Sequence, residues 1–277
     1  MIKNITYIAD YFVEQHQGGA ELSDEVVIES LSSCGHDVTR VKSAAFHPLD
    51  REPESQVYVI SNFTQLSELN KKWFVNSNIK YIIIERDQKY VRTRNTAMYK
   101  NFIAPKSEIV NEDFYRGAHK VFCLTSHSSE IFLKHIELDN ITSLGCTHFS
   151  KKQFDVLRKN IKNSKNDKFA IVSGKRSDIA IQFCLKNNLE YEIIKKTDYN
   201  NFIKNLSHYK GIVFFSHAVE TCCRLLVEAR VLNLRILTDN KNGCTYENWF
   251  KEKKGEDLLE YLEEEIPKNI KRIEESL

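Results

Sequence analysis

The chain has 277 residues, with 40 Lys and Arg against 38 Asp and Glu, and a formal net charge of +2. This balance argues against a protein that coats nucleic acid through bulk charge, although it allows a local basic patch. The length and a hydrophobic share of 42% permit one large domain or two of ordinary size. The sequence has no apolar run of about 18 residues, so no membrane span is expected. The first residues lack a signal-peptide pattern.

The seven cysteines indicate a reducing compartment. None forms a CxxC pair or joins histidines at zinc spacing, and most sit beside apolar residues, as small buried side chains do. We therefore expect free thiols, no metal site and a cytoplasmic location.

Strand-like and helix-like stretches alternate along the chain. The strand-like runs are residues 5–9, 37–41, 57–61, 81–85, 120–124, 141–144, 169–173, 191–194, 211–215 and 235–238. Helical patterns between them include residues 20–34, 126–135, 179–187 and 222–232. Short, nearly all-apolar strands are typical of buried parallel sheets, and the alternation predicts an α/β protein with doubly wound units.

One polar stretch interrupts this alternation. Residues 151–168 are rich in Lys and Asn, which predicts a short helix followed by a linker near 161–168. We expect two Rossmann-like domains, residues 1–160 and 161–277, that face each other across a cleft. In such sheets, ligands bind outside the carboxyl ends of the strands. The charged tail from Gly255 predicts an amphipathic surface helix that is broken at Pro267.

Three short segments at expected strand ends could carry chemistry. Gly18 and Gly19 precede the first helix, where they could bring backbone close to an anionic ligand or simply form a turn fitted for packing. Glu220 follows the strand at 211–215, and Glu228 lies about two turns into the next helix, which should begin near Thr221 or Cys222. Alternatively, both are surface glutamates without a binding role, and one of them caps the helix. The third segment follows the strand at 169–173 and contains Ser173, Gly174, Lys175 and Arg176. Its two adjacent cations could neutralise a diphosphate or simply stand in a charged turn.

Taken in this order, these segments resemble the retaining GT-B glycosyltransferases of family 4. The opening GGAELSDEVVIESLSSCGHDV is similar to that family's first glycine pair, helix and Gly-His turn. The residues from Glu220 to Glu228, followed by EARVLNLRILTDNKNG, resemble its E-x7-E motif and form the most specific part of the match.

The resemblance implies a donor site for a nucleotide-diphosphate sugar, with UDP as the expected nucleotide, and no cofactor or catalytic metal. By this similarity, Glu220 contacts the transferred sugar and Glu228 holds the ribose hydroxyls. The amides of Thr221, Cys222 and Cys223 approach sugar and phosphate, Lys175 or Arg176 neutralises the diphosphate, and Gly18 and Gly19 line the cleft. The sequence departs from the family where Ser177 and Asp178 replace a second cation. It also departs where Arg86 follows the fourth strand in place of a common histidine.

The acceptor is suggested only by one basic stretch. Residues 86–106 hold six cations against Asp87 alone, with interleaved aromatic rings. The acceptor-side candidates are Arg86, Asp87, Lys89, Tyr90, Arg92 and Arg94. Such a loop could bind DNA, and it loosely resembles bacteriophage glycosyltransferases that modify hydroxylated bases by flipping them out. Alternatively, it is a solvated loop whose tyrosines pack on the domain. A non-catalytic nucleotide- or sugar-binding module also stays open, whereas the missing G-x-G-x-x-G disfavours a Rossmann oxidoreductase.

Overall fold

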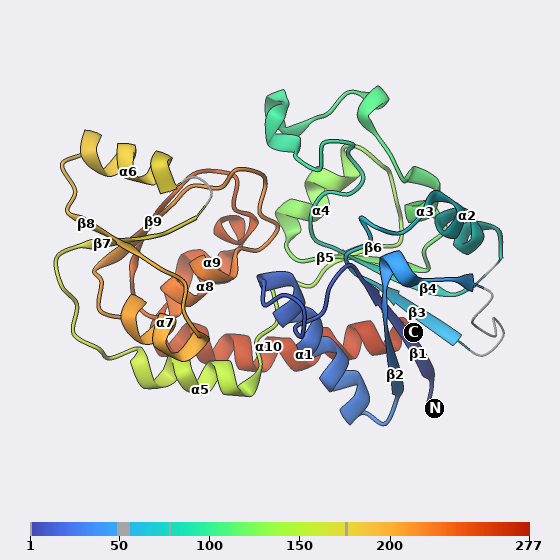
Figure 1. Cartoon of the computed structure of the whole chain (residues 1–277), viewed down its shortest axis with the longest axis horizontal. Helices are drawn as coiled ribbons and strands as arrows, with labels where there is room; N and C mark the ends of the chain where they lie inside the picture. Colours follow the sequence, from blue (N-terminus) through green and yellow to red (C-terminus); the bar gives the residue numbers. More distant parts are fainter. Residues whose placement is uncertain (1, 49–55, 78, 175–176) are drawn as a thin grey trace. The chain divides into compact units, whose positions relative to one another are not determined.

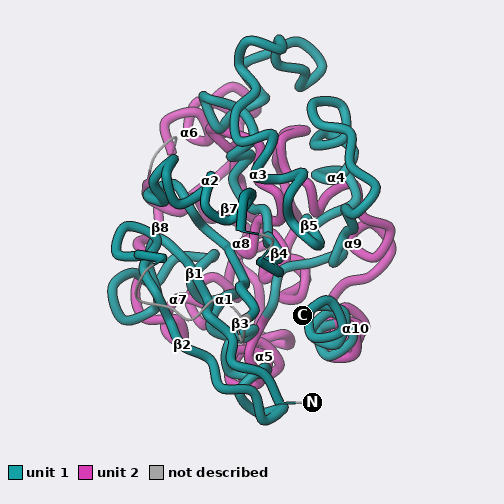
Figure 2. Tube along the Cα trace, turned by 90° about the vertical axis from the view of Figure 1, so that its right-hand side faces the viewer, with its two compact units in different colours: residues 1–148, 266–277 teal, residues 149–265 magenta. Residues whose placement is uncertain are grey.

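The structure is a computed structural model that describes residues 2–48, 56–77, 79–174 and 177–277 (Figure 1). The chain divides into two compact units, residues 1–148 with 266–277 and residues 149–265 (Figure 2). Lys175 and Arg176 lie outside the described residues.

The first unit is built on a six-stranded parallel sheet in the order β2-β1-β3-β4-β5-β6. Its strands are β1 Asn4–Ala9, β2 Asp37–Lys42, β3 Gln56–Ile60, β4 Tyr81–Glu85, β5 Lys120–Cys123 and β6 Ile141–Ser143. Its α-helices are α1 Gly19–Ser33, α2 Glu68–Asn76, α3 Glu112–Arg116 and α4 Ser126–Leu133. All five residues of β4 are buried, as expected for a central strand with both faces covered.

The second unit is built on a four-stranded parallel sheet in the order β10-β9-β7-β8. Its strands are β7 Phe169–Val172, β8 Tyr191–Ile194, β9 Gly211–Phe214 and β10 Arg235–Thr238. Its helices are α5 Lys151–Asn160, α6 Ser177–Lys186, α7 Tyr199–Leu206, α8 Arg224–Val231, α9 Asn248–Glu252 and the start of α10 Gly255–Glu275. Gly211 is required in β9 because an added Cβ would lie 2.5 Å from both the Arg235 carbonyl and the Phe169 ring.

The predicted strands are confirmed, each within one residue at either end. The expected boundary at residue 160 differs from the observed one at residue 148. The reason is local: Ser150 begins α5 with a capping box, and Phe154 and Leu157 of that helix are buried in the second unit. Residues 266–277 also return to the first unit, where Ile270 and Ile273 are buried.

The expected helix break at Pro267 is wrong. Helix α10 continues through Pro267 for 21 residues, although proline removes one backbone hydrogen bond within a helix. Buried apolar residues lie on both sides of it, among them Leu259 and Leu262 before it and Ile270 after it. Their packing offsets the free-energy cost of the hydrogen bond that proline removes. None of the described helices is both long and apolar enough to cross a membrane.

Candidate functional site

The carboxyl ends of the four strands in the second sheet gather the predicted donor-side residues. Because the strands are parallel, the segments after β7, β8, β9 and β10 all leave the same edge of this sheet. Ser173 follows β7 and is half-buried, while Gly174 is exposed. Glu220 lies in the segment after β9, the strand that neighbours β7.

The backbone at Glu220 is held in an extended conformation. Its amide donates to the Lys241 carbonyl at 2.9 Å, and its own carbonyl accepts from the Gly243 amide at 2.8 Å. The side chain is exposed, with Ser216 Oγ 3.4 Å from Oε1. The segment after β10 therefore fixes the position of Glu220 and leaves its carboxylate at the surface of the unit.

Helix α8 begins at Arg224, later than the predicted start at Thr221 or Cys222. The pairing of Glu220 with the segment after β10 keeps the chain extended, and Cys223 caps the helix with a φ of −69° and a ψ of 107°. The three residues that precede the helix are buried: Thr221, Cys222 and Cys223. Glu228 consequently lies little more than one turn into the helix, not two.

Glu228 is a buried carboxyl beside a buried cation. Its side chain is 7% exposed, and Arg224 Nε lies 3.9 Å from Oε1. The Arg224 guanidinium lies 4.1 Å above the Phe149 ring. Burial raises the pKa of Glu228 to about 7, against the opposing effects of Arg224, Tyr199 and Lys196. Near neutral pH this group can therefore either accept or donate hydrogen bonds.

Cysteines line the interior next to this segment. Cys222, Cys223 and Cys244 are buried and free, and burial raises the pKa of Cys223 and Cys244. Six of the seven cysteines are buried, as their apolar sequence context predicted, and Cys34 is exposed. Within the described ranges, no group of three or more His, Cys, Asp or Glu residues could hold a metal ion.

The glycine pair lies where it was predicted, at the start of α1 in the first unit. Gly18 caps the helix with no side-chain hydrogen bond, and Gly19 is its first residue. A Cβ on Gly18 would lie 2.4 Å from Glu21 Oε2 and 2.9 Å from His16 Nε2. A larger residue at this position would therefore displace the ends of the Glu21 and His16 side chains.

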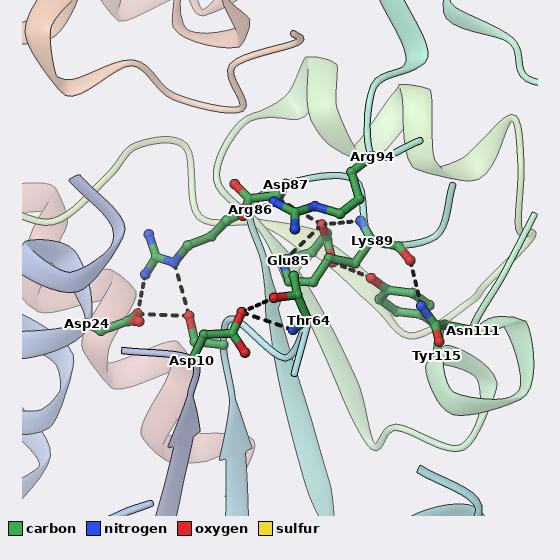
Figure 3. Close-up of polar contacts among 11 residues, drawn as sticks. Asp10, Asp24, Thr64, Glu85, Arg86, Asp87, Lys89, Arg94, Asn111 and Tyr115 are labelled. Carbon is green, nitrogen blue, oxygen red and sulfur yellow. Dashed lines mark hydrogen bonds and ion pairs between the residues drawn. The ribbon is translucent and has the colours of Figure 1, made fainter. Parts of the chain in front are cut away.

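Arg86 is buried in an ion pair, so the expectation that it faces an acceptor or donor is wrong (Figure 3). Its Nη2 donates to Asp24 Oδ1 at 2.6 Å, and its Nε donates to Ser61 Oγ at 3.1 Å. Asp24 Oδ1 also accepts from the Tyr7 hydroxyl at 2.8 Å. The side chains of Arg86 and Asp24 are 3% and 1% exposed, so Arg86 connects the carboxyl ends of β4 and β3 to α1.

Lys89 and Tyr90 are likewise inside the unit, which corrects their assignment to an exposed basic loop. Lys89 Nζ lies 3.6 Å from Glu85 Oε1, with both side chains 2% exposed (Figure 3). It also lies 5.2 Å above the Phe63 ring. Glu85 also accepts from the Tyr115 hydroxyl and from the Lys89 amide. Tyr90 is 1% exposed and packs in the core.

Only the outer part of the predicted acceptor-side segment is exposed. Arg92 lies 3.9 Å from Glu108, and Arg94 lies 3.6 Å from Asp87, with side-chain exposures of 65% and 49% for the two arginines. Tyr90 packs on the domain, as the alternative interpretation of this segment expected.

A buried carboxylate at the end of β1 was not singled out from the sequence. Asp10 accepts hydrogen bonds from Ser43, from the backbone and side chain of Thr64, and from the Gln65 amide at 3.0 Å. Burial opposes its ionisation, but these donors lower the pKa of Asp10 below its ordinary value. It therefore fixes the segment that follows β3. A charged residue directly after an apolar strand was the available signal for both Asp10 and Arg86.

No protein-family model and no curated protein matches the sequence. Among solved structures, AviGT4, a glycosyltransferase involved in avilamycin A biosynthesis, matches with a TM-score of 0.53 and 9% identity, over 99% of this chain and 96% of that one. The catalytic domain of starch synthase IV from Arabidopsis thaliana, bound to ADP and acarbose, matches with a TM-score of 0.54 and 8% identity, over 100% and 99%. The chain has a GT-B fold.

A third GT-B structure, HepE from Anabaena in complex with UDP and glucose, matches with a TM-score of 0.51 and 11% identity, over 96% of this chain and 89% of that one. At these identities the comparisons establish the fold alone. The two Rossmann-like units of the GT-B fold agree with the two parallel sheets described above.

Proposed function

We propose that this protein is a glycosyltransferase that moves a sugar from a nucleotide-diphosphate sugar to an acceptor hydroxyl. The observation that carries this proposal is the pair Glu220 and Glu228 at the carboxyl edge of the second sheet in a GT-B fold. One carboxylate is exposed on a fixed backbone, and the other is buried with a pKa of about 7. Carboxylates at these two depths suit a donor whose sugar and ribose both present hydroxyl groups.

The proposed roles follow from these positions. Glu220 accepts hydrogen bonds from hydroxyls of the transferred sugar, and Glu228 accepts them from the ribose. The amides of Thr221, Cys222 and Cys223 precede an eight-residue helix, whose first N–H groups favour an anion. UDP is the proposed nucleotide, in line with the UDP bound by HepE.

The proposed chemistry needs no metal and keeps the anomeric configuration. Lys175 or Arg176, together with the helix amides, would meet the charge of the departing diphosphate. The bond from the anomeric carbon to the phosphate oxygen breaks, and the acceptor oxygen bonds to the same face of that carbon. The acceptor proton passes to the leaving phosphate. This route needs no protein nucleophile, unlike double displacement between paired carboxylates.

A DNA acceptor loses part of its support in the sequence. It depended on cations and rings of residues 86–106, of which Arg86, Lys89 and Tyr90 are buried. We therefore propose that the acceptor hydroxyl belongs to a saccharide or a lipid-linked molecule. We also propose a cytoplasmic location, because the cysteines are free thiols, as is usual in a reducing compartment.

A thermal-shift panel of UDP, GDP, ADP and NAD tests the donor. Stabilisation by UDP and its sugars is expected, whereas stabilisation by NAD alone would reject the transferase. Transfer of labelled sugar to a polysaccharide or lipid extract, compared with hydroxymethylated DNA, then tests the acceptor. Binding of UDP-sugars without transfer to any of these would favour a non-catalytic module. The anomeric configuration of the product, measured by NMR, tests retention.

A further inference from the structure

One exposed loop of the first unit combines positive charge with apolar side chains. Residues 92–106, here called the basic loop, carry four Lys and Arg and no Asp or Glu. The basic loop lies between β4 and α3, and in Figure 1 it rises above α4 at the top of its unit. The function proposed above does not use it.

The base of the basic loop is tied to the unit. Val91 and Ile109 form an antiparallel bridge, and the Arg92 amide donates to the Glu108 carbonyl at 2.8 Å. Near its C-terminal end, the Ala104 amide donates to His135 Nε2 at 2.9 Å. The loop is therefore tied to the unit near both of its ends.

The backbone of the basic loop is also strained. Arg94, Asn101 and Phe102 have φ values of 52°, 56° and 60°, in the left-handed region that favours glycine. A bulky residue such as Phe102 is rarely found there. Backbone strain of this kind persists where the surrounding structure imposes it, and it is concentrated at functional surfaces.

Two large apolar side chains point away from the core on this loop. Met98 is 66% exposed and Ile103 is 47% exposed. Single exposed apolar residues are common, but these two lie five positions apart in a stretch with four cations, of which Arg92 and Arg94 lie near the carboxylates of Glu108 and Asp87. Lys100 and Lys106 are exposed, and neither makes an ion pair with any of the described residues.

This combination fits an anionic membrane surface better than a nucleic acid. Nucleic-acid binding would use aromatic faces for stacking on bases. The aromatic rings of this region expose little of their faces for stacking. Tyr90 is buried, Tyr99 is half-buried, and half-buried Phe102 packs edge-on against His127 at a centroid distance of 6.1 Å. Met98 and Ile103 have no stacking face, but they can enter the boundary between headgroups and acyl chains. The neighbouring cations would meet anionic headgroups.

We infer that the basic loop docks this protein on membranes that contain anionic phospholipids, through insertion of Met98 and Ile103 and electrostatic attraction of Lys100 and Lys106. This binding is peripheral. It concerns where the chain is held and is independent of the transferase chemistry proposed above.

Co-sedimentation with vesicles tests this inference. The full chain is mixed with vesicles of phosphatidylcholine alone or with phosphatidylserine added. We expect binding to the anionic vesicles only, weakened by salt because exposed charges are screened. Met98→Ser with Ile103→Ser should weaken binding about tenfold or more, and Lys100→Gln with Lys106→Gln should weaken it about thirtyfold. All four side chains are exposed or surface-facing, so the folded state should survive, as circular dichroism would verify.

Matched controls lie on α2 of the same unit. Leu69→Ser removes an apolar side chain that is 79% exposed, and Lys72→Gln removes an exposed cation. Neither should change vesicle binding. Absence of binding to anionic vesicles, or binding that the loop variants leave unchanged, overturns the inference. Loop-dependent binding of single-stranded DNA without vesicle binding also overturns it and restores a nucleic-acid role for this surface.

Discussion

The buried carboxyl of Glu228 predicts that nucleotide-sugar binding depends on pH. Burial raises its pKa to about 7 from 4.5, so the free protein carries a mixture of both forms near neutrality. The ionised form can accept hydrogen bonds from two ribose hydroxyls at once, while the protonated form has less acceptor capacity. Binding through the carboxylate should therefore weaken as the pH falls through 7.

The size of this effect follows from one-proton linkage. If only the ionised form binds, the apparent dissociation constant should be roughly tenfold higher at pH 6 than at pH 8. Calorimetric titration with UDP-glucose is the suitable assay. Its diphosphate carries no terminal phosphate, whereas the terminal phosphate of UDP would itself titrate near a pH of about 6.

Glu228→Gln is the informative variant. It should bind UDP-glucose more weakly than wild type at pH 8 and should show no slope between pH 6 and pH 8. Equal wild-type affinity at the two pH values, or a slope that survives in the Gln variant, would refute the reasoning.

The same carboxyl should affect stability without any ligand. Because the folded-state pKa of Glu228 is above its unfolded value, the contribution of this group is most favourable below pH 4.5 and is lost as the pH rises to about 7. Urea unfolding should therefore find that the free energy of unfolding of wild type, relative to that of Glu228→Gln, falls by up to about 3 kcal/mol between pH 4.5 and pH 8. The change with pH is the informative quantity, because the variant also removes the carboxylate beside Arg224 at every pH. A wild-type stability that runs parallel to that of the variant over this range would mean that Glu228 is not buried as described.

Three further predictions concern other residues. Glu220→Gln should lower turnover about a hundredfold with an unchanged melting temperature, because its side chain is exposed; full activity would remove Glu220 from the site. Arg86→Met should cost roughly 3–5 kcal/mol in urea unfolding because it leaves Asp24 buried and unpaired. Arg116→Met, in an exposed pair, should cost under about 1 kcal/mol, and equal costs would contradict the buried pair. Ellman's reagent should label one thiol quickly in the native protein and none in Cys34→Ser; fast labelling of others would contradict their burial.

Much of the fold could be predicted from the sequence because buried parallel strands leave a clear pattern. The run YIIIE at 81–85 has no polar residue before its end, and all of β4 is buried. The residue at which a helix begins depends on contacts that cannot be read from the sequence. Helix α8 starts at Arg224 because Glu220 pairs with residues after β10, which are distant in sequence.

The least predictable part was the burial of charge. Arg86 and Lys89 stand in a basic stretch, and charged residues are usually exposed. Their partners are Asp24, which is 62 residues away from Arg86, and Glu85, which ends an apolar strand. No local pattern distinguishes a lysine beside a buried carboxylate from one in solvent. The glutamate pair could be proposed from the sequence because its spacing is itself local.

The membership of residues 266–277 in the first unit has a consequence for how the protein folds. A chain emerging from the ribosome would present the six strands of the first unit long before Ile266, Ile270 and Ile273 of α10 could complete its core. The whole of residues 149–265 must be synthesised in between. Contacts with such a long sequence separation form slowly because the intervening chain must be ordered or looped out. The second unit, whose residues are contiguous, can therefore finish folding first, although its sequence begins later.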